Sequence, residues 1–189
     1  MELNAQDGGH RRFIMVQLDE PTPENSEARR AGYETICDIG QERIRRAGDK
    51  LKINHPDIDA GFRVFKVDDS NFVEPPEVWT LEILLDFVEN IKPDRNAWDL
   101  LFGTLIECGL TIDKPVTREV IAGFEVLIYG GEIFACFAAN VSEELIHELA
   151  ARHPQKIFFR DASFATSADK INAREYFRYF APDSDIKVL

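Results

Sequence analysis

Residues 11–20 read Arg11-Arg12-Phe13-Ile14-Met15-Val16-Gln17-Leu18-Asp19-Glu20, a short apolar run between a glycine pair and an acidic loop. Such a run is typical of a buried strand in a mostly parallel sheet. Residues 34–52 then place apolar side chains at helical spacing, which predicts an amphipathic helix. A strand, an acidic turn and a helix form half of a nucleotide-binding βαβ unit. The glycine-rich turn of such a unit would precede residue 11, so we expect the chain to begin in the middle of a domain.

The rest of the chain alternates strand and helix patterns. Gly130-Gly131 separate two apolar runs, 124–129 and 132–137, and predict a β-hairpin. A helix capped by Ser142, a strand over 156–160, a helix over 167–180 and a strand over 186–189 follow. Weaker signals predict a strand over 62–67, a helix over 81–91, and a helix over 98–105 with Gly109 as its C-cap. The predicted fold class is α/β: a partial Rossmann-like strand–helix unit in residues 1–55, then a mixed-sheet α/β domain with a β-hairpin edge in residues 56–189.

Composition and charge exclude several classes of protein. No apolar run approaches the ~20 residues of a membrane helix, and no signal peptide is recognised, so we expect a cytoplasmic protein. Cys37, Cys108 and Cys136 lack disulfide or metal spacing, which favours buried free thiols. Residues 57–189 carry 13 Lys or Arg against 24 Asp or Glu, a net charge of −11, whereas residues 1–56 carry nine against ten. Because DNA is bound by basic surfaces, we expect no direct DNA grip from residues 57–189.

Several long segments resemble one known family. They are NAQDGGHRRFIMVQL (4–18), AGY (31–33), ICDIGQERIRRAG (36–48), GFRVFK (61–66), SNF (70–72), FFRDASF (158–164) and ADKIN (168–172). The chain is similar in these segments to the C-terminal portion of the modification (Mod) subunit of type III restriction-modification systems. That subunit is an adenine-specific DNA methyltransferase.

The resemblance implies an intact enzyme that methylates adenine N6 in DNA with S-adenosylmethionine and that assembles with itself and a restriction (Res) subunit. The family's catalytic Asp-Pro-Pro-Tyr motif and its Phe-x-Gly-x-Gly cofactor turn have no counterpart in this chain. The segment Glu74-Pro75-Pro76-Glu77 lacks the aromatic residue and favours a rigid loop. We therefore predict no catalytic residue here, a chain that is inactive alone, and residues 1–55 as a remnant of the methyltransferase domain.

A residual cofactor role is predicted where the first strand would end. Rossmann-like methyltransferases receive the ribose hydroxyls on an acid at this place, because a carboxylate accepts two hydrogen bonds. Gln17, Asp19 and Glu20 occupy it. The simpler interpretation, a solvated acidic loop, is favoured, since a carboxylate without the glycine turn offers little binding energy.

Partial matches to other enzyme motifs lack the residue spacing that those motifs require. His147-Glu148 begins like a zinc-protease motif, but His153 is six residues on and off the required helical face. Val64 stands where a nuclease core before Lys66 needs an acid, so no metal site is predicted. Arg160-Asp161 lies at the end of a parallel strand, where ligands bind, yet an ion pair that fixes the next loop is favoured. The arginines of residues 43–46 are expected to pair with Glu34, Asp38 and Glu42 rather than bind DNA.

Two functions of different classes stay open. The first is the C-terminal part of a Mod methyltransferase. The second is a stand-alone binding or assembly module that pairs with itself or with a separately encoded methyltransferase half. Either predicts self-association, because a truncated first domain would expose the flank of its residue 13–18 strand.

Overall fold

The computed structural model describes residues 1–74 and 90–189, which divide into two compact units, Met1–Val67 (unit 1) and Asp68–Leu189 (unit 2). The domain boundary predicted at residue 55 lies inside unit 1. The Pro75-Pro76 loop and residues 81–89 of the helix predicted over 81–91 lie outside the described residues. Ile91, the last residue of that predicted helix, instead forms a β-bridge with Phe72.

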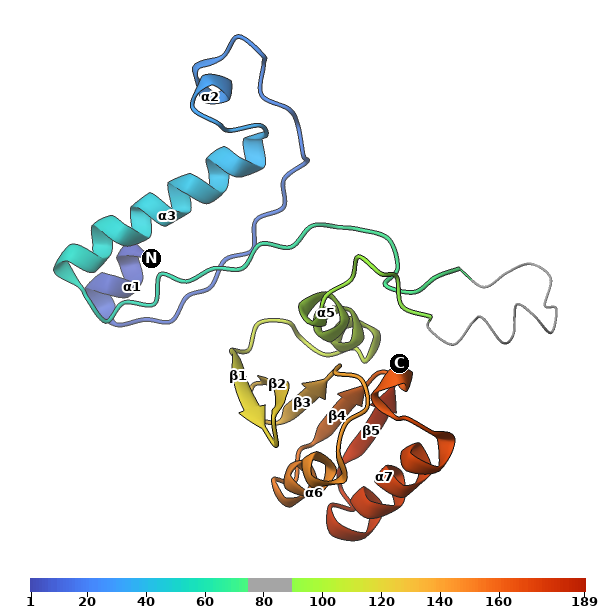
Figure 1. Cartoon of the computed structure of the whole chain (residues 1–189). Helices are drawn as coiled ribbons and strands as arrows, with labels where there is room; N and C mark the ends of the chain where they lie inside the picture. The colour runs from blue at the N-terminus through green and yellow to red at the C-terminus, as the bar shows by residue number, and fades with distance from the viewer. Residues whose placement is uncertain (75–89) are drawn as a thin grey trace. The chain divides into compact units, whose positions relative to one another are not determined.

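Unit 2 is built on a five-stranded mixed sheet in the order β1-β2-β3-β4-β5 (Figure 1). The first three strands, β1 (Val116–Ile121), β2 (Phe124–Tyr129) and β3 (Ile133–Cys136), pair antiparallel. The parallel part adds β4 (Lys156–Phe159) and β5 (Asp185–Val188) beside β3. This confirms the predicted mixed α/β sheet and the antiparallel hairpin of β2 and β3, but the strand at the antiparallel edge is β1 and not a strand of that hairpin. Strand β1 was missing from the sequence prediction.

Helices cover both faces of this sheet. One face packs against α5 (Ala97–Glu107), and the other packs against α6 (Glu143–Ala151) and α7 (Ser167–Phe180) (Figure 1). Successive side chains of a strand point to opposite faces of the sheet. In β2, Val126 and Ile128 therefore face α6 and α7, whereas Leu127 and Tyr129 face α5. The described residues of unit 2 therefore form two apolar cores, one on each face of the sheet.

Local sequence signals explain where these elements begin and end. Gly130 and Gly131 have φ of +61° and +77°, as a tight hairpin turn demands. Ser142 caps α6 by accepting the amide of Leu145 at 3.2 Å. Helix α5 ends as predicted near Gly109, whose φ of +67° lets its amide and that of Leu110 bond back to the last turn. A 3-10 turn, η1 (Asp161–Ser163), joins β4 to α7.

Unit 1 contains the three helices α1 (Glu2–Asp7), α2 (Glu27–Arg30) and α3 (Ile36–Asn54). Thr35 and Asp38 cap α3 reciprocally, which confirms the predicted helix. Residues 1–67, all of which are described, form no strand, and their one β-bridge joins Pro21 to Thr35. The strands predicted over 11–20 and 62–67 are therefore wrong for this structure. The physical reason is that a strand needs hydrogen-bonded neighbours, and unit 1 offers none.

The Rossmann-like assignment of unit 1 stays a prediction, because only the helical half of the expected strand–helix pair is observed. In the described part of the chain, no helix is both long and apolar enough to cross a membrane.

Candidate functional site

The most unusual feature of the molecule is an exposed run that we call the apolar segment, residues 13–18. Ile14 and Val16 are each 93% exposed, Leu18 on the same side is exposed as well, and so are Phe13 and Met15 on the alternate positions. Adjacent residues of an extended chain point to opposite sides. Both sides of this segment are therefore apolar and uncovered, which is the pattern of a strand that becomes buried on both faces.

The rest of unit 1 does not bury apolar side chains either. Among residues 1–67, all described, only Thr22 and Gly48 are buried. Thr22 is held by hydrogen bonds from its hydroxyl to the carbonyls of Tyr33 and Glu34 at 2.7 and 3.1 Å. Unit 1 thus has no hydrophobic core, although burial of such a core is what normally stabilises a domain.

The predicted cofactor residues lie at the end of the apolar segment, with Gln17 inside it and Asp19 and Glu20 directly after it, and all three are exposed. The side-chain amide of Gln17 donates to the carbonyl of Leu18 at 3.2 Å. Asp19 lies 3.8 Å from the Lys66 ammonium, and the Glu20 carbonyl accepts the Ile36 amide at 3.0 Å at the start of α3. The three side chains are neighbours in sequence, but they do not line a strand end in this structure. Their cofactor role stays a prediction.

Two arginines on the basic face of α3 share one glutamate of the same helix. Glu42 accepts hydrogen bonds from Arg45 at 2.6 Å and Arg46 at 2.7 Å, and the bond from Arg46 is the main reason that the pKa of Glu42 lies below its usual value. Of the three acids predicted from the helical spacing to pair with these arginines, Glu42 is confirmed. Asp38 instead completes the α3 cap.

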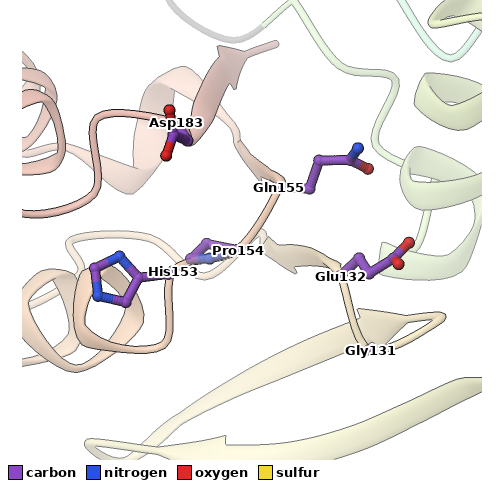
Figure 2. A pocket seen from close by; sticks show the side chains of 6 residues that line it. All are labelled: Gly131, Glu132, His153, Pro154, Gln155 and Asp183. Carbon is purple, nitrogen blue, oxygen red and sulfur yellow. The ribbon is translucent and has the colours of Figure 1, made fainter.

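Two surface hollows among the described residues of unit 2 are candidate ligand sites. The larger, about 430 Å³, is lined by Gly131, Glu132, His153, Pro154, Gln155 and Asp183. It lies at the amino ends of the parallel strands, opposite to the carboxyl ends where open α/β sheets bind ligands. Figure 2 shows the side chains of Glu132, His153 and Asp183 spread around Pro154 rather than converging on one point. Glu132 is moreover paired with Lys114 at 2.7 Å.

The smaller hollow, about 260 Å³, opens beside the carboxyl ends of β3 and β4. Its lining residues are Arg95, Ala97, Leu100, Glu125, Phe137, Ala138 and Arg160. The adjoining Asp161, predicted to form an ion pair that fixes the loop after β4, pairs with Lys170 of α7. Its own amide donates to the Leu189 carbonyl at 3.1 Å, which ties the loop to the end of β5. The Arg160-Asp161 position is therefore part of the framework of unit 2.

The histidine and cysteine side chains are the remaining candidates for metal binding or nucleophilic chemistry. Residues 1–74 and 90–189 hold no group of three His, Cys, Asp or Glu side chains placed to bind a metal ion. Cys136 is fully buried, and this burial raises the pKa of its thiol. Cys37 and Cys108 are only partly buried, so the expectation of three buried thiols is wrong for two of them.

One surface feature was missed by the sequence analysis. His147 of α6 stacks on Tyr176 of α7 with ring centroids 4.0 Å apart, and Tyr176 stacks on Phe180 at 4.3 Å. The spacing of Tyr176 and Phe180, four residues apart on a predicted helix, was a signal for part of it. The contribution of His147 depends on the packing of two helices, which periodicity does not reveal.

Comparison with known proteins identifies relatives of one kind. The chain is 25% identical to the Mod subunit of the type III restriction-modification enzyme EcoP15I of Escherichia coli over 98% of its own length. It is 41% identical to the Mod subunit of StyLTI of Salmonella typhimurium over 68 residues, or 35% of its length. No family model matches the chain.

These matches confirm that the chain resembles type III Mod subunits along nearly its whole length. The chain spans 29% of the length of the EcoP15I subunit, and its match to the StyLTI subunit spans 10% of that protein.

Proposed function

We propose that this chain is the C-terminal, non-catalytic part of a type III modification subunit. The intact subunit would transfer a methyl group from S-adenosylmethionine to adenine N6 in DNA and would associate with a Res subunit. The similarity to two Mod subunits supports this proposal. The absence of the Asp-Pro-Pro-Tyr and Phe-x-Gly-x-Gly sequences from the chain supports a part that does not carry the chemistry itself.

The observation that carries the proposal is the missing core of unit 1. The apolar segment is exposed on both sides, and burying each of its larger side chains is worth about 1.5–3 kcal/mol. Such a segment gains stability only when strands pair with its edges and other elements cover its faces. A methyltransferase sheet in the remainder of a Mod subunit would supply these neighbours, and unit 1 would become an interior strand and helix of that domain.

S-adenosylmethionine fits the residues beside the apolar segment only in part. Asp19 and Glu20 are exposed carboxylates that can accept hydrogen bonds from ribose hydroxyls, and Gln17 adds an amide. Residues 11–20 contain no glycine, so the glycine turn that holds the rest of the cofactor must come from another part of the subunit. The cofactor supplies the methyl group; these three residues would only hold its ribose.

Because of their charge, residues 57–189 would not contact DNA, and other parts of the enzyme would do so. Residues 57–189 carry a net charge of −11, which repels a polyanion. Unit 2 would then serve the assembly and stability of the subunit.

A graft tests the proposed function. Residues 1–189 replace the matching region of the EcoP15I Mod subunit, and adenine methylation is measured with labelled S-adenosylmethionine. We expect methylation by the grafted subunit and none by the isolated chain.

Two matched variants test whether methylation by the graft requires burial of the apolar segment. In the grafted subunit, Ile14→Asp should abolish methylation, because it places a charge inside the completed sheet. The control, Val120→Asp, changes an equally apolar residue on the edge strand β1, where 74% of the side chain is exposed, and should leave methylation intact. A folded graft without activity, or an active isolated chain, would contradict the proposal.

The second candidate function is a stand-alone assembly module. The same exposed segment favours it, because an uncovered strand edge also pairs with another copy or with a separate chain. A strict monomer in sedimentation of the isolated chain at high concentration removes this module. Self-association is expected of both functions, so methylation by the graft is the result that separates them.

A further inference from the structure

The outer surface of unit 2 carries a row of rings that we call the aromatic ladder: His147, Tyr176, Phe180 and Tyr179. The first three are stacked, with interplanar angles of 19° and 29°, and Tyr179 contacts the edge of Phe180 at a centroid distance of 4.9 Å. The ladder joins α6 to α7, which pack against each other on one face of the sheet (Figure 1).

Much of the ladder faces solvent. Tyr179 is 80% exposed and Phe180 is 50% exposed, while the buried residues of the same helix are Ala173 and Phe177. The core of unit 2 therefore does not need Tyr179 or the outer side of Phe180. Exposed aromatic rings in a contiguous group are typical of protein interaction sites, where rigid rings bury large areas at low entropic cost.

The acidic side chains near the aromatic ladder favour a positively charged partner. Glu143 and Glu144 lie one turn before His147 on α6, on the same side of the helix, and Glu148 follows. Within the described part of the chain, none of these three glutamates forms an ion pair. On α7, Arg178 is matched by Glu175 at 3.4 Å, and Arg174 adds one positive charge. The described residues of unit 2, 68–74 and 90–189, carry 11 Lys or Arg against 18 Asp or Glu, so their net charge is negative.

We propose that the aromatic ladder and the glutamates of α6 form a docking surface for an arginine- or lysine-rich segment of a partner protein. Guanidinium and ammonium groups are attracted to ring faces, and Arg also stacks on them. The glutamates then neutralise the partner's remaining charge and raise the rate of encounter. A single-stranded nucleic acid also stacks on aromatic rings, but its phosphates need a basic groove, and this surface is acidic.

The test measures binding to the full chain by fluorescence anisotropy. The probe is a labelled short arginine–glycine peptide; a glutamate–glycine peptide of the same length and a labelled oligothymidylate are the comparison probes. We expect the arginine peptide to bind and the other two not to bind.

Variants then locate the binding. The double variant Tyr179→Ser with Phe180→Ser should weaken binding of the arginine peptide about fivefold to tenfold. Glu143→Gln with Glu144→Gln should weaken it about threefold to fivefold and reduce its salt dependence. Two controls should bind as the parent chain does: Ile106→Ser, an exposed apolar residue of α5, and Glu24→Gln with Glu27→Gln in unit 1.

Three results would overturn the proposal. The first is an equal loss in the controls, which would make net charge the cause. The second is binding of the oligothymidylate that the ladder variants abolish. The third is a dimer, seen by sedimentation, that the ladder variants dissociate, because the surface would then belong to a second copy of the chain.

Discussion

Units 1 and 2 each contain a short apolar run, but the run of unit 2 is buried and the run of unit 1 is exposed. The run 124–129 lies in β2 between two paired strands, and its last four side chains are buried. The run 13–18 is as apolar, yet it pairs with no strand and is exposed. The difference teaches that an apolar run specifies a strand only when its neighbours are present, because backbone pairing and burial on both faces come from other segments.

The largest expected effect is on core packing. Phe158→Ala in unit 2 removes a fully buried ring from the core beneath α5 and should lower the free energy of unfolding by about 3–5 kcal/mol. Phe13→Ala removes the same atoms from the apolar segment, and in the isolated chain it should change stability by no more than about 0.5 kcal/mol. Urea unfolding followed by circular dichroism measures both. A large cost for Phe13→Ala would reveal a core in unit 1 and end the comparison.

Replacing a glycine by alanine should lower stability in unit 2 and raise it in unit 1. At Gly130 of unit 2 the φ of +61° and the Lys114 side chain, 2.5 Å from an added Cβ, should make Gly130→Ala cost about 1–2 kcal/mol. At Gly40 of α3 an added Cβ meets open space, so Gly40→Ala should raise helix stability by about 0.5–1 kcal/mol. Thermal unfolding read by circular dichroism separates the two. A destabilising Gly40→Ala would mean that α3 is already packed closely on that side.

The smallest expected effect concerns the caps of α3 and α7. The Thr35 amide donates to Asp38 at 2.9 Å, and this bond is the main cause that lowers the pKa of Asp38. Its stabilising contribution is therefore complete above the unfolded pKa of about 3.9 and disappears as the pH falls through the lower folded pKa.

As the pH falls through that window, α3 should lose helix at its first turn. Helix α7, whose Ala173 and Phe177 are buried in the core, should keep its structure. NMR chemical shifts of both helices follow the change, and Asp38→Asn provides the control without titration at this position. If α3 kept its first turn through the window while Asp38 titrated, the cap would not be what holds it.

The sequence predicted most of unit 2 because the signals there are local and agree with one another. Ser142 marked the start of α6, the glycine pair marked the hairpin, and the helix over 167–180 was predicted with the observed bounds. Strand β1 was missed because Thr117, Arg118 and Glu119 are exposed and polar, as expected of an edge strand.

Prediction failed in unit 1, where the predicted structure depends on neighbours that residues 1–67 do not provide. The helix of α3 needed only its own cap and spacing and was correct, whereas the strand over 11–20 needed a sheet. The cofactor role of Gln17, Asp19 and Glu20 depends on that same sheet and stays a prediction. The aromatic ladder combines two helices, so no single stretch of sequence could indicate it.

Hydrogen exchange at the amides of residues 13–18 tests most directly whether unit 1 is half of a larger domain. The exchange is measured in the isolated chain at low concentration and in the same residues grafted into the EcoP15I Mod subunit. We predict fast exchange in the isolated chain and strong protection in the graft, because the amides would form hydrogen bonds within the completed sheet. Protection in the isolated monomer, or fast exchange in a folded graft, would contradict it.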